Sequence, residues 1–228
     1  MDSRRAESFS DGVFAVAITI LVFNLLPVGA DTISSRQLTH ALSSAWPQYA
    51  AYAVSFLTIG IMWMNHHTML ALVSRVDRPL LALNLFLLMG VVAIPFPTAL
   101  VAEHLTGQFR AGGSIAAVVY GLAMIAISIG YSGMWLYLEF HRQRLGAPAR
   151  MRSPGAASIR FSIGLVGYVA ATLLAAFVSA AAALVLYGVI AVYYLFDHLP
   201  DPAGADAGPA GDSDPAGFAG QAGAASGE

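Results

Sequence analysis

The stretch RAESFSDGVFAVAITILVFNLLPV, residues 5–28, places Arg5, Glu7 and Asp11 directly before an uncharged run that reaches Ala30. About 20 apolar residues, at about 1.5 Å rise per residue, cross a hydrocarbon core of about 30 Å. The composition agrees, because 57% of the residues are hydrophobic and only 11% are charged, and a soluble globule of 228 residues has too much surface for so few polar side chains. We therefore expect an integral membrane protein.

Charge-free windows along the chain predict an all-α membrane protein with six transmembrane helices. The last window is too long for one crossing and just long enough for two, so we expect a break near Ser179. If it formed one long tilted helix instead, the C-terminus would lie on the other side of the membrane. The windows are residues 12–30, 41–65, 79–102, 111–138 and 161–196.

The arginines indicate that both termini are cytoplasmic. The chain has no lysine, and with the N-terminus inside, nine arginines fall on cytoplasmic segments against only Arg36 and Arg110 on outer loops. Residues 1–199 then form the transmembrane domain. Residues 200–228, rich in Pro, Gly, Ala and Asp, cannot build a core, and we expect a disordered cytoplasmic tail. The nine arginines are Arg4, Arg5, Arg75, Arg78, Arg142, Arg144, Arg150, Arg152 and Arg160.

A secretory signal peptide cleaved after Ala30 is the alternative interpretation of the first segment. Glu7 and Asp11 oppose it, because that signal begins with a positively charged region, and the apolar run is longer than its usual core. The twin-arginine export pattern fits less well, since polar Glu7 and Ser8 stand where that signal turns apolar. The absence of cysteine excludes disulfides, thiolate metal sites and cysteine nucleophiles, and no nucleic-acid-binding signature is present.

At 100° per residue, the first helix separates an apolar stripe from a polar cluster. Ser10 and Asp11 point well away from the stripe. A charged Asp costs on the order of 2.5–3.5 kcal/mol at the centre of a bilayer and less at a helix end, so we expect Asp11 to have partners. The stripe consists of Phe9, Val13, Val16, Ile20, Phe23 and Pro27.

Candidate partners for Asp11 lie at the same level of the second and third helices. Adjacent histidines point about 100° apart on a helix, and no His-Glu-x-x-His spacing exists, so we expect no metal site. A hydrogen-bonded network that joins the first three helices is favoured, because these side chains can satisfy buried polar atoms across helices. The candidates are Trp63, Asn65, His66, His67 and Asn84.

These residues resemble a known family. Arg5-x-x-x-Phe9-Ser10-Asp11, followed by GVFAVAIT, is similar to the R-x-x-x-F-S-D signature that opens the first helix of prokaryotic potassium channels of the transmembrane protein 175 family. The stretches FLTIGIMWMNHH and NLFLLMGVVAIPFPTAL resemble that family's second and third helices. The resemblance extends from Arg5 to about Leu100, and six helices with both termini inside agree with it.

The resemblance implies a moderately selective potassium channel of the prokaryotic plasma membrane, a homotetramer whose first helices line a central pore. Such channels lack a T-V-G-Y-G carbonyl filter, as does this sequence, and a hydrophobic constriction takes its place. The constriction would be rings of Val16, Ile20 and Phe23, with the hydroxyl of Thr19 beside the lowest ring. The base of the first helix would be held by Arg5, Phe9, Ser10 and Asp11 against Trp63, His66, His67 and Asn84. Potassium is the permeant ion, and no cofactor is implied.

Two positions depart from the family pattern. Asn24 stands where many relatives have an acidic residue, which removes a charge that would attract cations near the outer end. Phe23 is bulkier than the usual aliphatic residue and would narrow or move the constriction. Asp31 and Glu103 would partly restore an acidic outer mouth.

Other interpretations stay open. The stripe would face lipid if it had no pore role. A small secondary transporter would use the third helix, broken by Pro95 and Pro97, as its binding site, and it predicts an internal repeat, for which IRFSIG at residues 159–164 is a weak echo. A membrane enzyme needs convergent ionisable groups, which the spans lack beyond the cluster on the first helix, so we expect no enzyme.

Overall fold

The computed structural model describes residues 3–25, 35–104, 110–147 and 154–196. Every element in these residues is a helix. This agrees with the predicted all-α fold. The predicted tail, residues 200–228, lies outside the described residues. The elements are α1 (Ser3–Ile20), the 3₁₀ helix η1 (Leu21–Leu25), α2 (Ser35–Ser44), α3 (Trp46–Ala71), α4 (Arg78–Ala93), α5 (Pro95–His104), α6 (Arg110–Phe140), α7 (Arg142–Leu145), α8 (Pro154–Phe177) and α9 (Ala180–Phe196).

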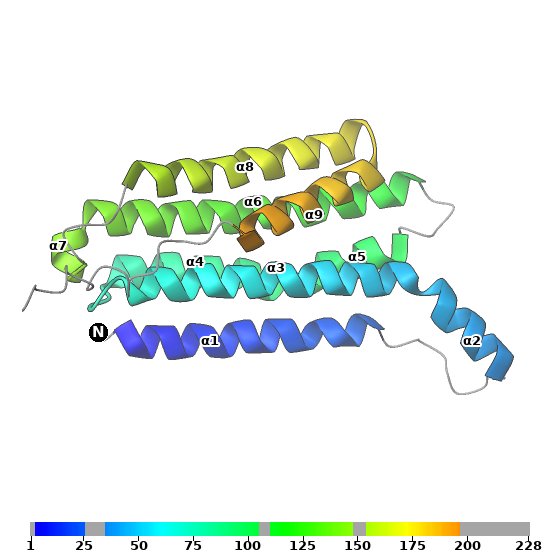
Figure 1. The fold of residues 1–228 in the computed structure, drawn as a ribbon, viewed down its shortest axis with the longest axis horizontal. Helices are drawn as coiled ribbons and strands as arrows, with labels where there is room; N and C mark the ends of the chain where they lie inside the picture. The colour runs from blue at the N-terminus through cyan, green and yellow to red at the C-terminus, as the bar shows by residue number, and fades with distance from the viewer. Residues whose placement is uncertain (1–2, 26–34, 105–109, 148–153, 197–228) are drawn as a thin grey trace, which may run out of the picture.

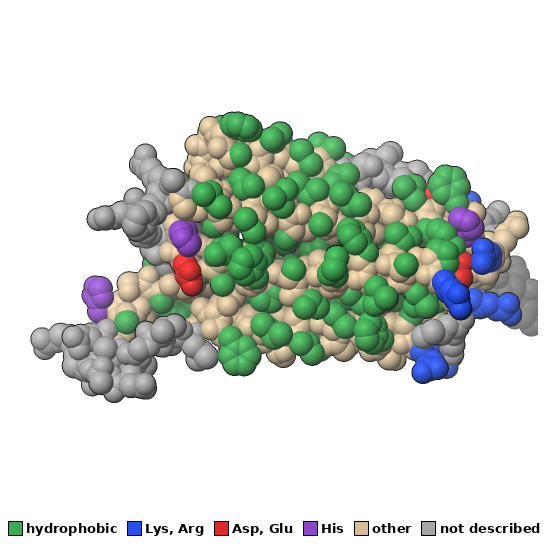
Figure 2. Space-filling view, turned by 180° about the vertical axis from the view of Figure 1, so that it is seen from behind, with side chains coloured by type: hydrophobic (Ala, Val, Ile, Leu, Met, Phe, Trp, Pro, Cys, Tyr) green, Lys and Arg blue, Asp and Glu red, His purple; other side chains and the backbone are tan. Residues whose placement is uncertain are grey.

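The long helices run side by side along one axis, and the short helices α2 and α7 lie at opposite ends (Figure 1). Three segments are long and apolar enough to cross a membrane: Ser3–Leu25, Arg78–His104, which joins α4 and α5, and Gly112–Phe140. In the space-filling view, apolar side chains cover the middle of the visible face, and arginines gather at one end (Figure 2). That end carries the start of α1, the start of α4 and α7 (Figure 1).

The expected break near Ser179 is present. Helix α8 ends at Phe177, α9 begins at Ala180, and α9 runs back along α8 (Figure 1). The amide N–H groups of Val178 and Ser179 both donate to the carbonyl of Leu174, at 3.0 and 2.9 Å, which closes the end of α8. The interpretation as one long tilted helix is therefore wrong.

The second and third predicted windows need correction. The second window was expected to begin at residue 41, but α2 ends at Ser44 and the long helix α3 begins at Trp46 and continues to Ala71. A proline in the first turn of α3 explains the new start, because proline is favoured there and disfavoured inside a helix. The third window is broken between Ala93 and Pro95, as the prolines predict.

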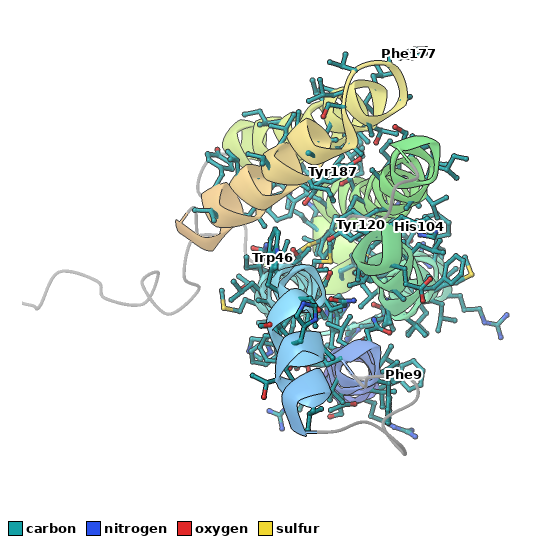
Figure 3. The ribbon with its side chains drawn as sticks, turned by 90° about the vertical axis from the view of Figure 1, so that its right-hand side faces the viewer. Phe9, Trp46, His104, Tyr120, Phe177 and Tyr187 are labelled. Carbon is teal, nitrogen blue, oxygen red and sulfur yellow. The ribbon has the colours of Figure 1, made fainter. Side chains whose placement is uncertain are left out.

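Helix α6 lies against α4, α5, α8 and α9 and forms the centre of the bundle. Glycines allow its close approach to α4: a Cβ at Gly90 would meet Cγ1 of Ile127 at 2.7 Å, and a Cβ at Gly130 would lie 3.3 Å from the backbone of Leu87. Seen along the bundle, Tyr120 and Tyr187 lie inside, whereas α1 lies at the edge and Phe9 points away from the other helices (Figure 3).

The loop between α3 and α4 is tied to α7. The carboxylate of Asp77 caps α4 by accepting the N–H of Leu80 at 3.2 Å, and it also accepts the hydroxyl of Tyr137 at 2.7 Å and pairs with Arg144 at 3.4 Å. Desolvation opposes the charge, but these hydrogen bonds and the arginine outweigh it and lower the pKa of Asp77. The carbonyl of Leu145 accepts both N–H groups of Ser74 and Arg75.

Candidate functional site

Helix α1 presents an apolar face that no other described helix covers. Its opposite face packs on α3 and α4 and buries Phe14, Ala17 and Leu21. The exposed face contains the predicted stripe, with Val16 53%, Ile20 38% and Phe23 65% exposed. Phe9 is also exposed, Val13 is half-buried, and Pro27 lies outside the described residues. Large apolar side chains in a row that the other described residues leave exposed are available for contact with lipid or with other copies.

The stripe continues onto the 3₁₀ helix η1, which sequence reasoning did not predict. In an α-helix a step of three residues leaves side chains about 60° apart, whereas in a 3₁₀ helix residues i and i+3 are eclipsed. The change of helix type after Ile20 therefore brings Phe23 over Ile20, more directly than a continuous α-helix would. Val22, 45% exposed, joins the same outer end.

Thr19 places a hydroxyl group next to Ile20 of the stripe. Its hydroxyl donates to the carbonyl of Val16 at 2.9 Å, and the side chain is exposed beside Ile20. Because this bond uses the only hydroxyl proton, the oxygen keeps lone pairs that can accept from water or face a cation.

Asn24 joins the outer end of η1 to the break between α4 and α5. Its side-chain amide donates to the carbonyl of Pro95 at 3.1 Å. Asn24 was predicted only as a missing negative charge, and the structure gives it a contact that a carboxylate could not make, since a carboxylate has no proton to donate. Of the two acids expected at the outer mouth, Glu103 is exposed on α5 and Asp31 lies outside the described residues.

A directed chain of hydrogen bonds connects α1, α4 and α3 near their arginine-rich ends. The hydroxyl of Ser10 donates to the carbonyl of Ala6 at 2.8 Å and accepts the side-chain amide of Asn84 at 3.0 Å. The amide oxygen of Asn84 then accepts from Nε2 of His66 at 2.7 Å. All three side chains are buried, so removing one partner would leave another buried polar group unsatisfied.

A second contact joins α1 to α3. The indole N–H of Trp63 donates to Oδ1 of Asp11 at 2.8 Å, which gives the carboxylate the partner that its position near hydrocarbon requires. His67 does not join Asn84 but pairs through Nδ1 with Oε1 of Glu7, at 2.9 Å. The two adjacent histidines thus serve different contacts, as their angular separation predicts.

The structure places the predicted anchor residues in two groups. Ser10, Asp11, Trp63, His66 and Asn84 are brought together as described, whereas Arg5 and Phe9 are exposed side chains on α1. Sequence reasoning missed Glu7 and also Phe14, whose ring lies 5.3 Å from that of His66. The four-residue spacing of Glu7 and Asp11, which puts both on one helix face, is the signal that could have revealed Glu7. The remaining candidate, Asn65, lines a cavity between α3, α6, α8 and α9.

That cavity has a volume of about 50 Å³, enough for a few water molecules. Tyr131, Tyr168 and Ser128 line it together with apolar side chains. Its lining residues belong to α3, α6, α8 and α9 and not to the break between α4 and α5, where a secondary transporter would bind its substrate. A cavity of this size suits bound water and not an organic solute.

Comparisons with known proteins agree on one family. Residues 5–95 match the family model described as the endosomal/lysosomal potassium channel TMEM175. A protein of Streptomyces collinus named a potassium channel is 46% identical over 205 residues, which cover 88% of this chain and 95% of that protein. A Chamaesiphon minutus protein, also named a potassium channel, is 35% identical over 193 residues, covering 85% of this chain and 93% of that protein.

A solved structure shares the fold. The crystal structure of a lysosomal potassium-selective channel TMEM175 homologue from Chamaesiphon minutus matches with a TM-score of 0.72 and 34% identity, and the match covers 85% of this chain and 96% of that chain. This match covers a larger share of the chain than residues 5–95, which the family model matches.

Proposed function

We propose that this chain, which belongs to the TMEM175 family of potassium channels, is a potassium channel whose pore is lined by α1 and η1. The observation that carries the proposal is the apolar stripe of Val16, Ile20 and Phe23, which the other described residues leave exposed. Relatives that match nearly the full chain are named potassium channels, which supports potassium as the permeant ion.

Symmetric copies are needed to close such a pore. The stripe lies on one helix at the edge of the bundle, and one helix cannot enclose a channel (Figure 3). We propose a homotetramer in which a four-fold axis brings four stripes face to face, because a rotation that closes gives a ring with equivalent side chains at each level. The arginine-rich end then faces the cytoplasm of a cell whose plasma membrane holds the channel.

The rings would control conduction through hydration. A narrow apolar constriction excludes water and ions until it widens, and an ion that passes must shed part of its hydration shell. Potassium sheds water at a lower cost than sodium, so the constriction gives a moderate preference for potassium without a carbonyl filter. The oxygen of Thr19, next to Ile20, would partly replace the lost water for the passing ion.

The buried contacts of α1 would hold the pore helix in place. Ser10 and Asp11 bind α4 and α3 at the inner end, and Asn24 binds the α4–α5 break at the outer end. The helix is thus fixed at both ends on the face opposite the stripe. No residue in this arrangement is assigned a catalytic role, and no cofactor is assigned.

A thiol-accessibility experiment tests the proposal, because the chain has no cysteine of its own. Phe23→Cys and Ile20→Cys should make potassium flux into vesicles sensitive to a membrane-impermeant thiol reagent, since the modified side chain fills the pore. Val189→Cys, exposed on α9, is the matched control and should stay insensitive. Equal insensitivity of all three variants, with normal flux, would place the stripe outside the pore and favour lipid contact.

The same vesicles distinguish a channel from a secondary transporter. The break between Ala93 and Pro95 favours a transporter, which would use it as a binding site. A transporter predicts slow, saturable uptake that Phe23→Cys modification leaves unchanged. The proposed channel predicts a fast potassium flux that does not saturate over the potassium concentrations at which a transporter would.

A further inference from the structure

Glu7, Asp11 and His67 form a compact cluster between α1 and α3. Glu7 and Asp11 lie four residues apart on one face of α1, and His67 approaches them from α3. One potential ligand atom from each side chain lies within 4.8 Å of the other two, and Nδ1 of His67 is 2.9 Å from Oε1 of Glu7.

The chemistry of the cluster suits a first-row divalent cation. Two carboxylates and one imidazole are ligands that Zn²⁺ and similar ions accept, with bonds of about 2.0–2.2 Å. Such bonds place tetrahedral ligand atoms roughly 3.4 Å apart, so the cluster needs a contraction of about an ångström or less at each side chain. Ca²⁺ and Mg²⁺ prefer shells made only of oxygen, which the imidazole does not provide.

The charge of the cluster, its access to solvent and the hydrogen bond from Trp63 also favour a bound cation. The three side chains carry a net negative charge whether or not His67 is protonated. The side chains of His67 and Glu7 are 51% and 23% exposed, so an ion can reach them from solution and keep water in its open positions. Trp63 donates to Oδ1 of Asp11 and fixes the orientation of that carboxylate, as outer-shell partners of metal ligands do.

We propose that Glu7, Asp11 and His67 bind one first-row divalent transition-metal cation, for which Zn²⁺ is the probe. The site differs from the one that the sequence argument excluded, because it uses His67 alone and takes its other ligands from α1. It lies on the side of α1 that faces α3, whereas Phe9, two residues from both Glu7 and Asp11, points about 200° away from each. The cation would therefore link α1 to α3 without entering the stripe.

Zn²⁺ binding to the purified full chain, measured by titration calorimetry, tests the site directly. Glu7→Gln and His67→Asn should each weaken the tightest binding step at least tenfold, whereas His40→Asn and Glu103→Gln, at exposed positions elsewhere, should bind as the wild type does. Co²⁺ in place of Zn²⁺ should give a visible absorption band that both cluster variants lose. Unchanged binding in both variants, or equal loss in the control variants, would overturn the site.

A consequence for conduction rests on the proposed function and is tested separately. Zn²⁺ applied at the arginine-rich side should change the open fraction of the wild-type channel and leave that of His67→Asn unchanged. Calorimetric binding without an effect on current would overturn this consequence alone. Binding by a protein that carries no potassium current would overturn the channel proposal and leave the metal site standing.

Discussion

Ile20 and Phe23 are large apolar side chains that remain exposed in a single copy of the chain. Burying a side chain of this size contributes about 1.5–3 kcal/mol, so a surface that keeps several of them uncovered has lipid or another copy as its neighbour. Changing the size of these side chains distinguishes lipid from another copy as the neighbour. A side chain in a pore sets the width of the constriction, whereas a side chain in lipid does not.

Removing this bulk should open the constriction. Ile20→Ala and Phe23→Ala should each raise the unitary potassium conductance severalfold or lower the preference for potassium over sodium, because a wider ring strips less water from the ion. Recordings from the purified variants measure both quantities. Val189→Ala on α9 is the matched control, and variants that conduct like this control would assign the stripe to lipid.

Asn24 offers a test of how the outer ring is positioned. Asn24→Asp replaces the donor with a carboxylate that cannot hydrogen-bond to the carbonyl of Pro95 and instead repels it. We expect a changed open fraction or conductance, and Asn24→Gln, which keeps the amide, should recover part of the wild-type behaviour. If Asn24→Asp only increased cation entry, as an added charge at the mouth would, and left gating intact, the positioning role would be wrong.

Asn84 tests the buried network. Asn84→Leu leaves Ser10 and His66 without their partner, and an unsatisfied buried polar group costs about 1–3 kcal/mol each. Thermal unfolding of the purified protein in detergent should therefore shift to lower temperature. Leu85→Ala, at the exposed neighbouring position, should shift it far less, and equal shifts would show that the network adds no stability beyond packing.

At the scale of elements, the helices and the chain reversals follow from the sequence better than the ends of the helices do. The reversal near Ser179 and the break at Pro95 could be predicted because length and proline act locally. The 3₁₀ helix η1 could not be predicted, because Asn24 near its end is held by a hydrogen bond to Pro95, and this contact joins segments that are far apart in the sequence. The separate helix α2 was not predicted either, for another reason: its polar residues carry no signal that distinguishes a helix from a loop.

The candidate site shows the same division. The residues of the apolar stripe on α1 could be predicted from helical periodicity, but their exposure could not, because the opposite side, with Phe14, Ala17 and Leu21, is also apolar and is buried. The pairing of His67 with Glu7, and of His66 with Asn84, depends on how three helices pack, which periodicity does not give. Arg5 was expected in the anchor, yet it lies exposed, because it is on the outward face of α1, whereas Ser3 and Ala6 on the other face are buried.

The loop before α4 gives a prediction at the element scale. Asp77→Ala removes the cap of α4 and the contacts to Tyr137 and Arg144, and loss of an N-cap typically costs about 0.5–2 kcal/mol. The midpoint temperature of thermal unfolding should be lower in Asp77→Ala than in the wild type at neutral pH. Gln143→Ala, exposed on α7, is the control and should have little effect.

The effect of Asp77 should also depend on pH. Its pKa is lowered in the folded state below the ordinary value of 3.8, so its ionised form stabilises the protein above that value. The stabilisation is lost as the pH falls through the lower, folded pKa. The difference between wild type and Asp77→Ala should thus stay constant from neutral pH to about pH 5 and narrow only in stronger acid. A difference that narrowed near pH 6 would point to a histidine instead.

At the scale of the whole molecule, a single copy of the chain exposes a large apolar surface. Its bundle is centred on α6, with α1 at the edge (Figure 3), and the stripe of α1 is one of several apolar faces that the described residues leave exposed. A four-fold assembly would bury this stripe around an axis and leave the remaining apolar faces to lipid. Chemical crosslinking of the detergent-purified protein followed by mass analysis should give a tetramer, and a stable monomer that conducts would contradict the arrangement.

The measurement that tests the central claim most directly is single-channel recording of the purified protein in planar bilayers, with potassium on one side and sodium on the other. A potassium channel should give unitary current steps that reverse toward the potassium equilibrium potential, at rates that no transport cycle reaches. Silent bilayers, together with slow saturable uptake in vesicles from the same preparation, would contradict the channel proposal and leave the stripe of Val16, Ile20 and Phe23 as a packing surface.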